Sequence, residues 1–377
     1  MNKDRSLLWQ SASRLVIAVA AFAVLGGGSA TVRADDTAPP GRSIGYAFYA
    51  IEWGITQTKD TKAECPQGLA ELGPREQYKL QFPDDGTQRK LVDTQLAREA
   101  DVWFPRAQQD QFPFRLAAGK TAFGLDLDGK VKPTDFTSPE GKPGVDNQLF
   151  RVIGCIFNYR VGGSVQNFDQ IFQKKMEFDR LIVELTDVDS LVNDDDVTIT
   201  TYRGRDKLVT DATGNTFQPG GTQRIDTRFG KDFMHAAKGK IVNGVLTTQP
   251  MDFKNPHEVR YEDAAYDWMR DARFELKLTP DGAQGVIGGY ADIESFYRSR
   301  NRTWGTHHLS YGQQASASVY RELRKLADGF PDPKTGVNTA ISAAYTVKLV
   351  QVHILHPQKE VAKIDDAPSA GQLADAK

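Results

Sequence analysis

Ala272-Arg-Phe-Glu-Leu-Lys-Leu-Thr279 decides the fold class, because its apolar and charged side chains alternate strictly. In an extended chain Phe274, Leu276 and Leu278 point to one side, and the charged residues between them point to the other. The residues that follow, 280–290, contain a Pro-Asp-Gly turn and a second β-prone segment. One buried face and one solvated face are typical of an antiparallel sheet.

Further β signals lie on both sides of this segment. Lys240-Ile-Val-Asn-Gly-Val-Leu-Thr247 places Asn-Gly between two aliphatic pairs, and Asn-Gly favours the type I′ turn of a tight hairpin. Strands are also predicted over 43–57, 121–127, 149–159, 178–185, 197–202 and 344–355, and short helices over 87–100, 164–175 and 315–328. Helices do not alternate regularly with strands. The sequence therefore predicts a mainly β protein, an antiparallel β-sandwich with two or three short helices and with a jelly roll as one version.

The N-terminal residues have the features of a secretory signal peptide. Three basic residues precede an apolar run over 15–25, and small residues follow it. This run is too short for a retained membrane anchor, which needs about 20 apolar residues. We expect a signal peptide over 1–34, a polar lead-in over 35–42, a single β-rich domain over 43–356 and a disordered tail over 357–377. The expected location is the periplasm or the extracellular space, with no membrane span in the mature chain.

Cys65 and Cys155 are the only cysteines, and their number fits export. Two thiols tend to pair in an oxidising compartment. Their bridge would close a loop of about 90 residues and stabilise the fold by about 4–5 kcal/mol. Two separate buried thiols are the alternative. Neither a c-type haem attachment nor a cysteine zinc site is compatible with two cysteines.

The charge of the chain is nearly balanced, with 47 basic and 49 acidic residues. Lys and Arg do not form a block anywhere in the chain. Because nucleic-acid binding depends on a basic patch, this balance argues against a nucleic-acid partner.

The stretch over residues 124–199 alternates apolar segments with turns rich in aspartate. Calcium takes six to eight oxygen ligands, and Asp126-Leu-Asp128-Gly129 has the alternating carboxylates of a calcium loop, although not of an EF-hand. The three adjacent carboxylates at 194–196 would repel one another without a cation or a basic partner. The expected calcium ligands are Asp126, Asp128, Asp146, Asn147, Asp187, Asp189, Asp194, Asp195 and Asp196. The alternative is that these residues only form turns, which Asp and Asn favour.

The sequence contains two other kinds of candidate site, a group of histidines and a pair of glutamates. All histidines lie beyond residue 230 without the spacing of a metal motif, so we expect ordinary loop and strand roles for them. Glu52 and Glu184 lie on predicted strands, and a glycosidase would need such a pair about 5–10 Å apart. A nucleophile elbow, a phosphate-binding loop and a dinucleotide fingerprint are missing from the sequence. The sequence therefore favours a role without catalysis.

Four stretches resemble a group of exported bacterial β-rich proteins to which no activity is assigned. They are Gly144-Val-Asp-Asn-Gln-Leu-Phe-Arg-Val-Ile-Gly-Cys155, Asp187-Val-Asp-Ser-Leu-Val-Asn-Asp-Asp-Asp-Val197, Lys238-Gly-Lys-Ile-Val-Asn-Gly-Val-Leu-Thr-Thr-Gln-Pro250 and Gly329-Phe-Pro-Asp-Pro-Lys-Thr-Gly-Val-Asn-Thr-Ala-Ile-Ser342. The resemblance agrees with export and implies no activity.

The leading interpretation is an exported, non-catalytic binding protein whose acidic loops hold calcium and whose partner is a carbohydrate or an envelope protein. The alternatives are a secreted hydrolase that acts on a glycan and an accessory subunit of a periplasmic assembly.

Overall fold

The computed structural model describes residues 42–70, 113–163, 166, 180–256, 266–302 and 316–357. The chain divides into two compact units, residues 1–35 and 36–377, and all described residues belong to the second. The predicted signal peptide, the lead-in up to residue 41, the helix over 87–100 and the tail from residue 358 lie outside the described residues. Most of the helix predicted over 164–175 also lies outside them.

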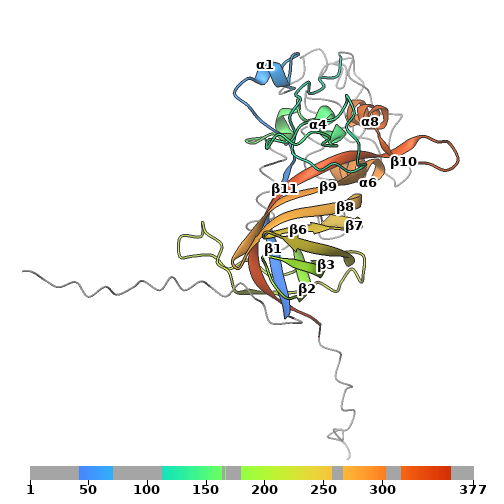
Figure 1. Cartoon of the computed structure of the whole chain (residues 1–377). Coiled ribbons are helices and arrows are strands. Elements are labelled where there is room, and N and C mark those ends of the chain that lie inside the picture. Colours follow the sequence, from blue (N-terminus) through green and yellow to red (C-terminus); the bar gives the residue numbers. More distant parts are fainter. Residues whose placement is uncertain are drawn as a thin grey trace, which may run out of the picture. The chain divides into compact units, whose positions relative to one another are not determined.

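Among the described residues, eight antiparallel strands pair edge to edge in a closed ring (Figure 1). In spatial order they are β1 (Arg42–Trp53), β2 (Leu181–Val188), β3 (Asp194–Arg203), β5 (His235–Val242), β6 (Val245–Thr248), β8 (Tyr266–Thr279), β9 (Gly282–Asp292) and β11 (Asn338–Leu355). β11 pairs with β9 on one side and with β1 on the other, so the sheet returns to its first strand.

The predicted β-sandwich is therefore wrong, and so is its jelly-roll version. The protein is mainly β with few helices, as expected, but its sheet closes into a β-barrel. The physical reason is that strand alternation reports only one buried face. A strand in a barrel and a strand in a sandwich bury alternate side chains in the same way.

Three short strands and several helices complete the described structure. β4 (Gly221–Arg224) runs parallel to the end of β11, β7 (Met251–Pro256) pairs with β8, and β10 (Gly329–Pro331) pairs with the start of β11. The helices are α1 (Thr61–Glu64), α4 (Gln148–Ile153), η1 (Phe157–Tyr159), α6 (Ile293–Arg302) and α8 (Ser316–Lys325). α8 confirms most of the helix predicted over 315–328, and it ends at Lys325. None of the described helices is both long enough and apolar enough to span a membrane.

Alternate strand residues form the main apolar core. Phe274, Leu276 and Leu278 of β8 are all buried, as their spacing predicts. Rings from separate elements meet around Trp53, whose ring centroid lies 4.7 Å from that of Tyr345 and 5.5 Å from that of Phe296. The hairpin predicted over 240–247 is also confirmed, because Asn243 and Gly244 have φ of 52° and 78° between β5 and β6.

Two segments predicted as strands adopt other structures. Residues 149–159 form α4 and η1, because the Asn147 side chain accepts a hydrogen bond from the Phe150 N–H and begins a helix. A short, uniformly apolar run fits a buried strand and a buried helix equally well, so its composition did not distinguish them. Residues 121–127 make only isolated bridges, to Thr137 and Asp146.

Candidate functional site

The structure divides the predicted calcium ligands between the two ends of β1. Asp126, Asp128 and Asp146 each offer a carboxylate oxygen, and these oxygens lie within 4.8 Å of one another. Their loop lies beside the end of β1, where Asn147 Nδ2 donates to the carbonyls of Gly54 and Phe123. The other five residues lie at the β2–β3 turn, and the end of β2 beside this turn pairs with the start of β1. They are Asp187, Asp189, Asp194, Asp195 and Asp196. The nine residues therefore do not form one site.

Backbone hydrogen bonds shape the group of three carboxylates. Asp126 Oδ1 accepts from the N–H of Gly129 at 2.7 Å, and Asp128 Oδ1 accepts from the N–H of Lys130 at 3.0 Å. Asp146 Oδ2 accepts from the N–H of Leu127 at 2.8 Å. The third bond joins the loop to Asp146, which is about twenty residues further along the chain. Tertiary structure thus adds the third carboxylate to a pair that is local in sequence.

Lys132 supplies a positive charge inside this group. Its Nζ forms an ion pair with Asp128 Oδ2 and lies 3.8 Å from Asp146 Oδ1. The hydrogen bond to Lys132 holds the pKa of Asp128 below its usual value. A metal ion at this position would therefore compete with the Lys132 ammonium for two of the three carboxylates.

Burial changes the protonation of Asp146. The residue is only 2% exposed, and this burial raises its pKa to about 6. The hydrogen bond from Leu127 and the charge of Lys132 oppose the shift, whereas the Asp128 carboxylate adds to it. Asp146 thus titrates about two pH units above an ordinary aspartate, whose pKa is 3.8.

We predict that Asp146→Asn stabilises the protein at pH 7. The folded pKa of Asp146 lies above the unfolded value, so its proton stabilises the fold fully below about pH 4, and that stabilisation is lost as the pH rises through about 6. Asn keeps an acceptor for Leu127 but carries no charge. The free energy of unfolding at pH 7 should rise by about 1–3 kcal/mol. Urea denaturation between pH 4 and pH 7 measures it.

Asp195→Asn is the control, because it also removes one carboxylate but at an exposed position. If the Asp146→Asn variant kept the wild-type slope of stability between pH 4 and pH 6, the proposed titration of Asp146 would be wrong.

The acidic β2–β3 turn has internal partners for its carboxylates. Asp194 Oδ2 accepts from the N–H of Asp189 at 2.6 Å, and Asp194 Oδ1 accepts from the N–H of Asp196 at 3.1 Å. Lys238 Nζ lies 2.8 Å from Asp196 Oδ1 and provides the basic partner that three adjacent carboxylates need. These contacts are those of a structural turn, the alternative to a calcium loop at this position.

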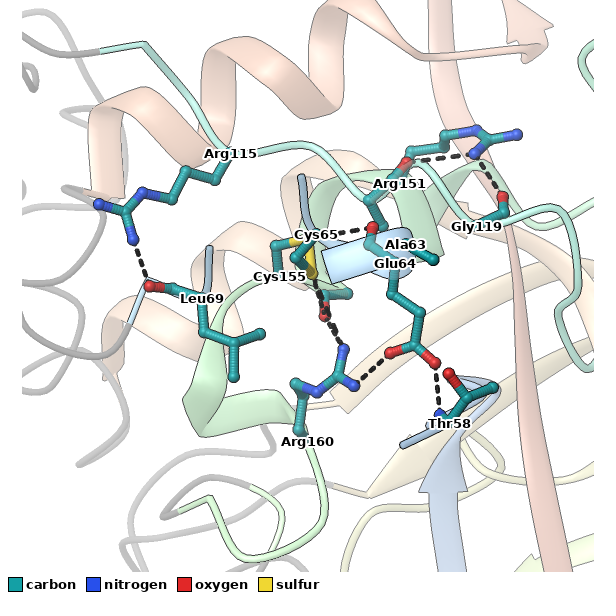
Figure 2. The surroundings of a disulfide bond; sticks show 12 residues. Thr58, Ala63, Glu64, Cys65, Leu69, Arg115, Gly119, Arg151, Cys155 and Arg160 are labelled. Carbon is teal, nitrogen blue, oxygen red and sulfur yellow. Dashed lines mark hydrogen bonds and ion pairs between the residues drawn. A yellow bond between two sulfur atoms is a disulfide. The ribbon is translucent and has the colours of Figure 1, made fainter. Parts of the chain in front are cut away.

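The predicted disulfide is confirmed. Cys65 and Cys155 form a bridge with a Cα–Cα distance of 5.7 Å (Figure 2). Beside it, Arg160 Nη2 lies 2.5 Å from Glu64 Oε2, and Arg160 Nη1 donates to the carbonyl of Gly154 at 2.6 Å. Both side chains of this ion pair are almost fully buried. No local pattern in the sequence marks Glu64 and Arg160 as a pair, although Glu64 directly precedes Cys65.

The two glutamates considered for glycoside hydrolysis lie far apart. Glu184 pairs with Gly45 in the β1–β2 register, and Glu52 is seven residues further along β1. At ~3.3 Å per residue their backbones are roughly 20 Å apart, beyond the about 5–10 Å of a catalytic pair. Glu184 instead accepts from the Tyr202 hydroxyl and contacts His356 Nε2 at 2.8 Å. The structure does not bring Glu52 and Glu184 together.

Of the six histidines, three are described. Burial lowers the pKa of His235, whose Nε2 lies 3.1 Å from the carbonyl of Asp232. His353 is exposed on β11, and His356 contacts Glu184. His257, His307 and His308 lie outside the described residues.

A cleft of about 1060 Å³ lies between the loop 207–217 and the β8–β9 hairpin, on the outer wall of the barrel. The β1–β11 register shifts between Phe48 and Ala50, and Tyr49 lies at this bulge. A bulge re-aims a side chain, and here Tyr49 lines the cleft while Phe48 remains in the core. The Tyr49 and Phe217 ring centroids are 4.9 Å apart. Sequence reasoning missed this site, because neither a bulge nor a contact between distant segments can be recognised from the local pattern.

The lining of this cleft combines apolar residues with a larger set of polar ones. Leu208, Leu349 and Val350 accompany the two rings. The polar residues are Lys207, Thr210, Asn215, Thr216, Lys277, Thr279, Asp281 and Gln284. Most of these polar groups are neutral amides and hydroxyls, which donate or accept hydrogen bonds without selecting for charge.

The fold and this site define a disulfide-bonded, antiparallel β-barrel with an aromatic cleft on its outer wall. Searches against protein-family models, curated proteins and solved structures find no match to this chain.

Proposed function

We propose that this protein is an exported, non-catalytic binding protein that holds a carbohydrate in the cleft beside Tyr49 and Phe217. The observation that carries the proposal is the aromatic pair in a lining whose polar groups are mostly neutral amides and hydroxyls. A sugar ring has an apolar face of C–H groups and a polar edge of hydroxyls, so it matches this combination. The cleft volume of about 1060 Å³ is close to the upper size of small-molecule sites.

The disulfide supports the location in this proposal. A buried bridge between the only two cysteines is typical of proteins in an oxidising compartment, such as the periplasm or the extracellular space. The separation of Glu52 and Glu184 leaves hydrolysis by that pair without support. An envelope protein as partner and membership in a periplasmic assembly remain untested predictions.

Phe217→Ala should weaken carbohydrate binding about tenfold, because it removes one face of the aromatic pair, and about 1.4 kcal/mol corresponds to a factor of ten. A glycan array followed by calorimetry with the best-bound sugar measures the change. Phe229→Ala is the matched control, since Phe229 packs against Arg203 and Phe233 and does not line this cleft. Equal losses in the two variants, or binding to no carbohydrate, would contradict the proposal.

Calcium at Asp126, Asp128 and Asp146 is a second candidate, favoured by the convergence of three carboxylates. Lys132 is the competing cation. Calcium should therefore bind the Lys132→Met variant about tenfold more tightly than the wild type, by isothermal titration. Asp126→Asn should weaken binding, and Asp195→Asn, at the other acidic turn, should leave it unchanged. If the melting temperature were the same with calcium and with a chelator, in the wild type and in Lys132→Met, the calcium proposal would be wrong.

A further inference from the structure

A second cleft, of about 410 Å³, lies on the same strands. Trp53, Phe123 and Thr346 line it, together with Gln166. Gln166 is only 5% exposed, and its Nε2 has no hydrogen-bond partner among the described residues. A buried amide donor without a partner is costly, and a ligand acceptor in this cleft would satisfy it.

The two clefts share part of their lining. Lys277 and Gln284 line both of them. The strand register pairs Lys277 of β8 with Gln284 of β9, and Gln284 with Lys348 of β11, so the three exposed residues form one row across the wall. The first cleft lies on one side of this row and the second on the other. The two clefts therefore adjoin at this row, and together they follow β9 and β11 along the wall; they are called the combined groove below.

The charges that line the combined groove cancel. Three are positive and three are negative, namely Lys207, Lys277 and Lys348 against Asp281, Glu52 and Glu140. A polyanion would require a surplus of basic residues. The balance, together with the neutral amides and hydroxyls, fits an uncharged ligand.

We infer that the ligand is a neutral oligosaccharide chain that lies along β9 and β11 and occupies both clefts. This inference rests on the proposed function and extends it from one sugar ring to a polymer. The residues of β9 that line the two clefts run from Gly282 to Val286, about 13 Å at ~3.3 Å per residue, and loop residues line each cleft as well. A sugar ring is about as wide as one strand spacing of ~4.8 Å, so about two to three rings fit along this length of β9.

The test is a length series. Calorimetry with neutral gluco-, galacto- and manno-oligosaccharides of about one to six units should show an affinity that rises at least about tenfold from the monosaccharide to the tetrasaccharide. Val161→Trp should fill the second cleft, because Val161 lines it and is 71% exposed. This variant, and Gln166→Leu, should reduce the affinity for the tetrasaccharide to that for the monosaccharide. Val337→Trp, at an exposed valine that lines neither cleft, is the matched control and should bind like the wild type.

The possible failures can be distinguished. Equal affinity at every length, with no effect of Val161→Trp, would overturn the chain inference and leave the single-sugar proposal standing. Binding to no saccharide would overturn both. Tighter binding of heparin than of every neutral oligosaccharide would overturn the argument from charge balance and with it the inference of a neutral chain.

Discussion

Replacing Cys65 and Cys155 together by serine should lower the free energy of unfolding by about 4–5 kcal/mol. The two residues are 90 positions apart, so the bridge removes a large part of the conformational freedom of the unfolded chain. It joins the residue after α1 to the segment after α4, and both cysteines are at most 1% exposed. Equilibrium denaturation in urea measures the loss.

The double alanine variant is the control for this experiment. Serine adds two buried hydroxyls to a cluster that contains Phe136 and Phe150, whereas alanine removes the bridge without adding polar groups. The two double variants should share most of their loss, because the chain-entropy effect is common to both. A loss below about 1 kcal/mol in both would show that the bridge contributes little to stability.

Arg160→Met should lower the free energy of unfolding by about 3–5 kcal/mol. Methionine keeps much of the length of the side chain, but it leaves the Glu64 carboxylate buried without its cation (Figure 2). The carbonyl of Gly154 also loses the donor that lies 2.6 Å away. Urea denaturation of the oxidised protein measures the effect.

Arg224→Met is the matched control for Arg160→Met. Arg224 also pairs with a carboxylate, that of Asp206, but the arginine side chain is 56% exposed. Water replaces the lost partner there, so the expected change is below about 1 kcal/mol. Adding Glu64→Gln to Arg160→Met should recover part of the stability, because it removes the unpaired charge. Equal effects of Arg160→Met and Arg224→Met would contradict the role assigned to burial.

The disulfide and the buried ion pair should not act independently. Arg160 Nη1 lies 3.9 Å from Cys65 Sγ, and Glu64 is adjacent to Cys65 in the chain. Groups that share neighbours give non-additive changes in stability. The stability lost on removing both therefore should differ from the sum of the separate losses.

Local sequence patterns correctly predicted those strands, turns and helices whose structure depends on residues only a few positions apart in the chain. The alternation in β8, the Asn243-Gly244 hairpin and the apolar face of α8 each follow from side chains a few positions apart. The strand prediction over 149–159 is wrong because apolar composition alone does not distinguish a buried strand from a buried helix. Its helical structure depends on Asn147, which caps α4 and also bonds to Gly54 and Phe123.

The candidate sites also combine features that a local pattern predicts with features that only the tertiary structure shows. Asp126 and Asp128 are neighbours in sequence and were recognised as one loop, but the contribution of Asp146 and the competing charge of Lys132 required coordinates. The cleft beside Tyr49 and Phe217 joins segments that are far apart in the chain. Such a contact leaves no periodic signal in either segment.

The sequence by itself determined that the protein is mainly β and that its chain turns tightly at Asn243-Gly244, and it favoured a bridge between the two cysteines. These properties follow from side-chain alternation, from the φ preference of Asn-Gly and from the presence of only two thiols. Only the tertiary structure decided that the sheet closes into a barrel, that the acidic residues separate to the two ends of β1, and that an aromatic cleft lies on the outer wall. The physical reason is that these features depend on strand register and on loop packing between distant residues. The same local alternation of side chains is compatible with a barrel and with a sandwich, so it does not select one of them.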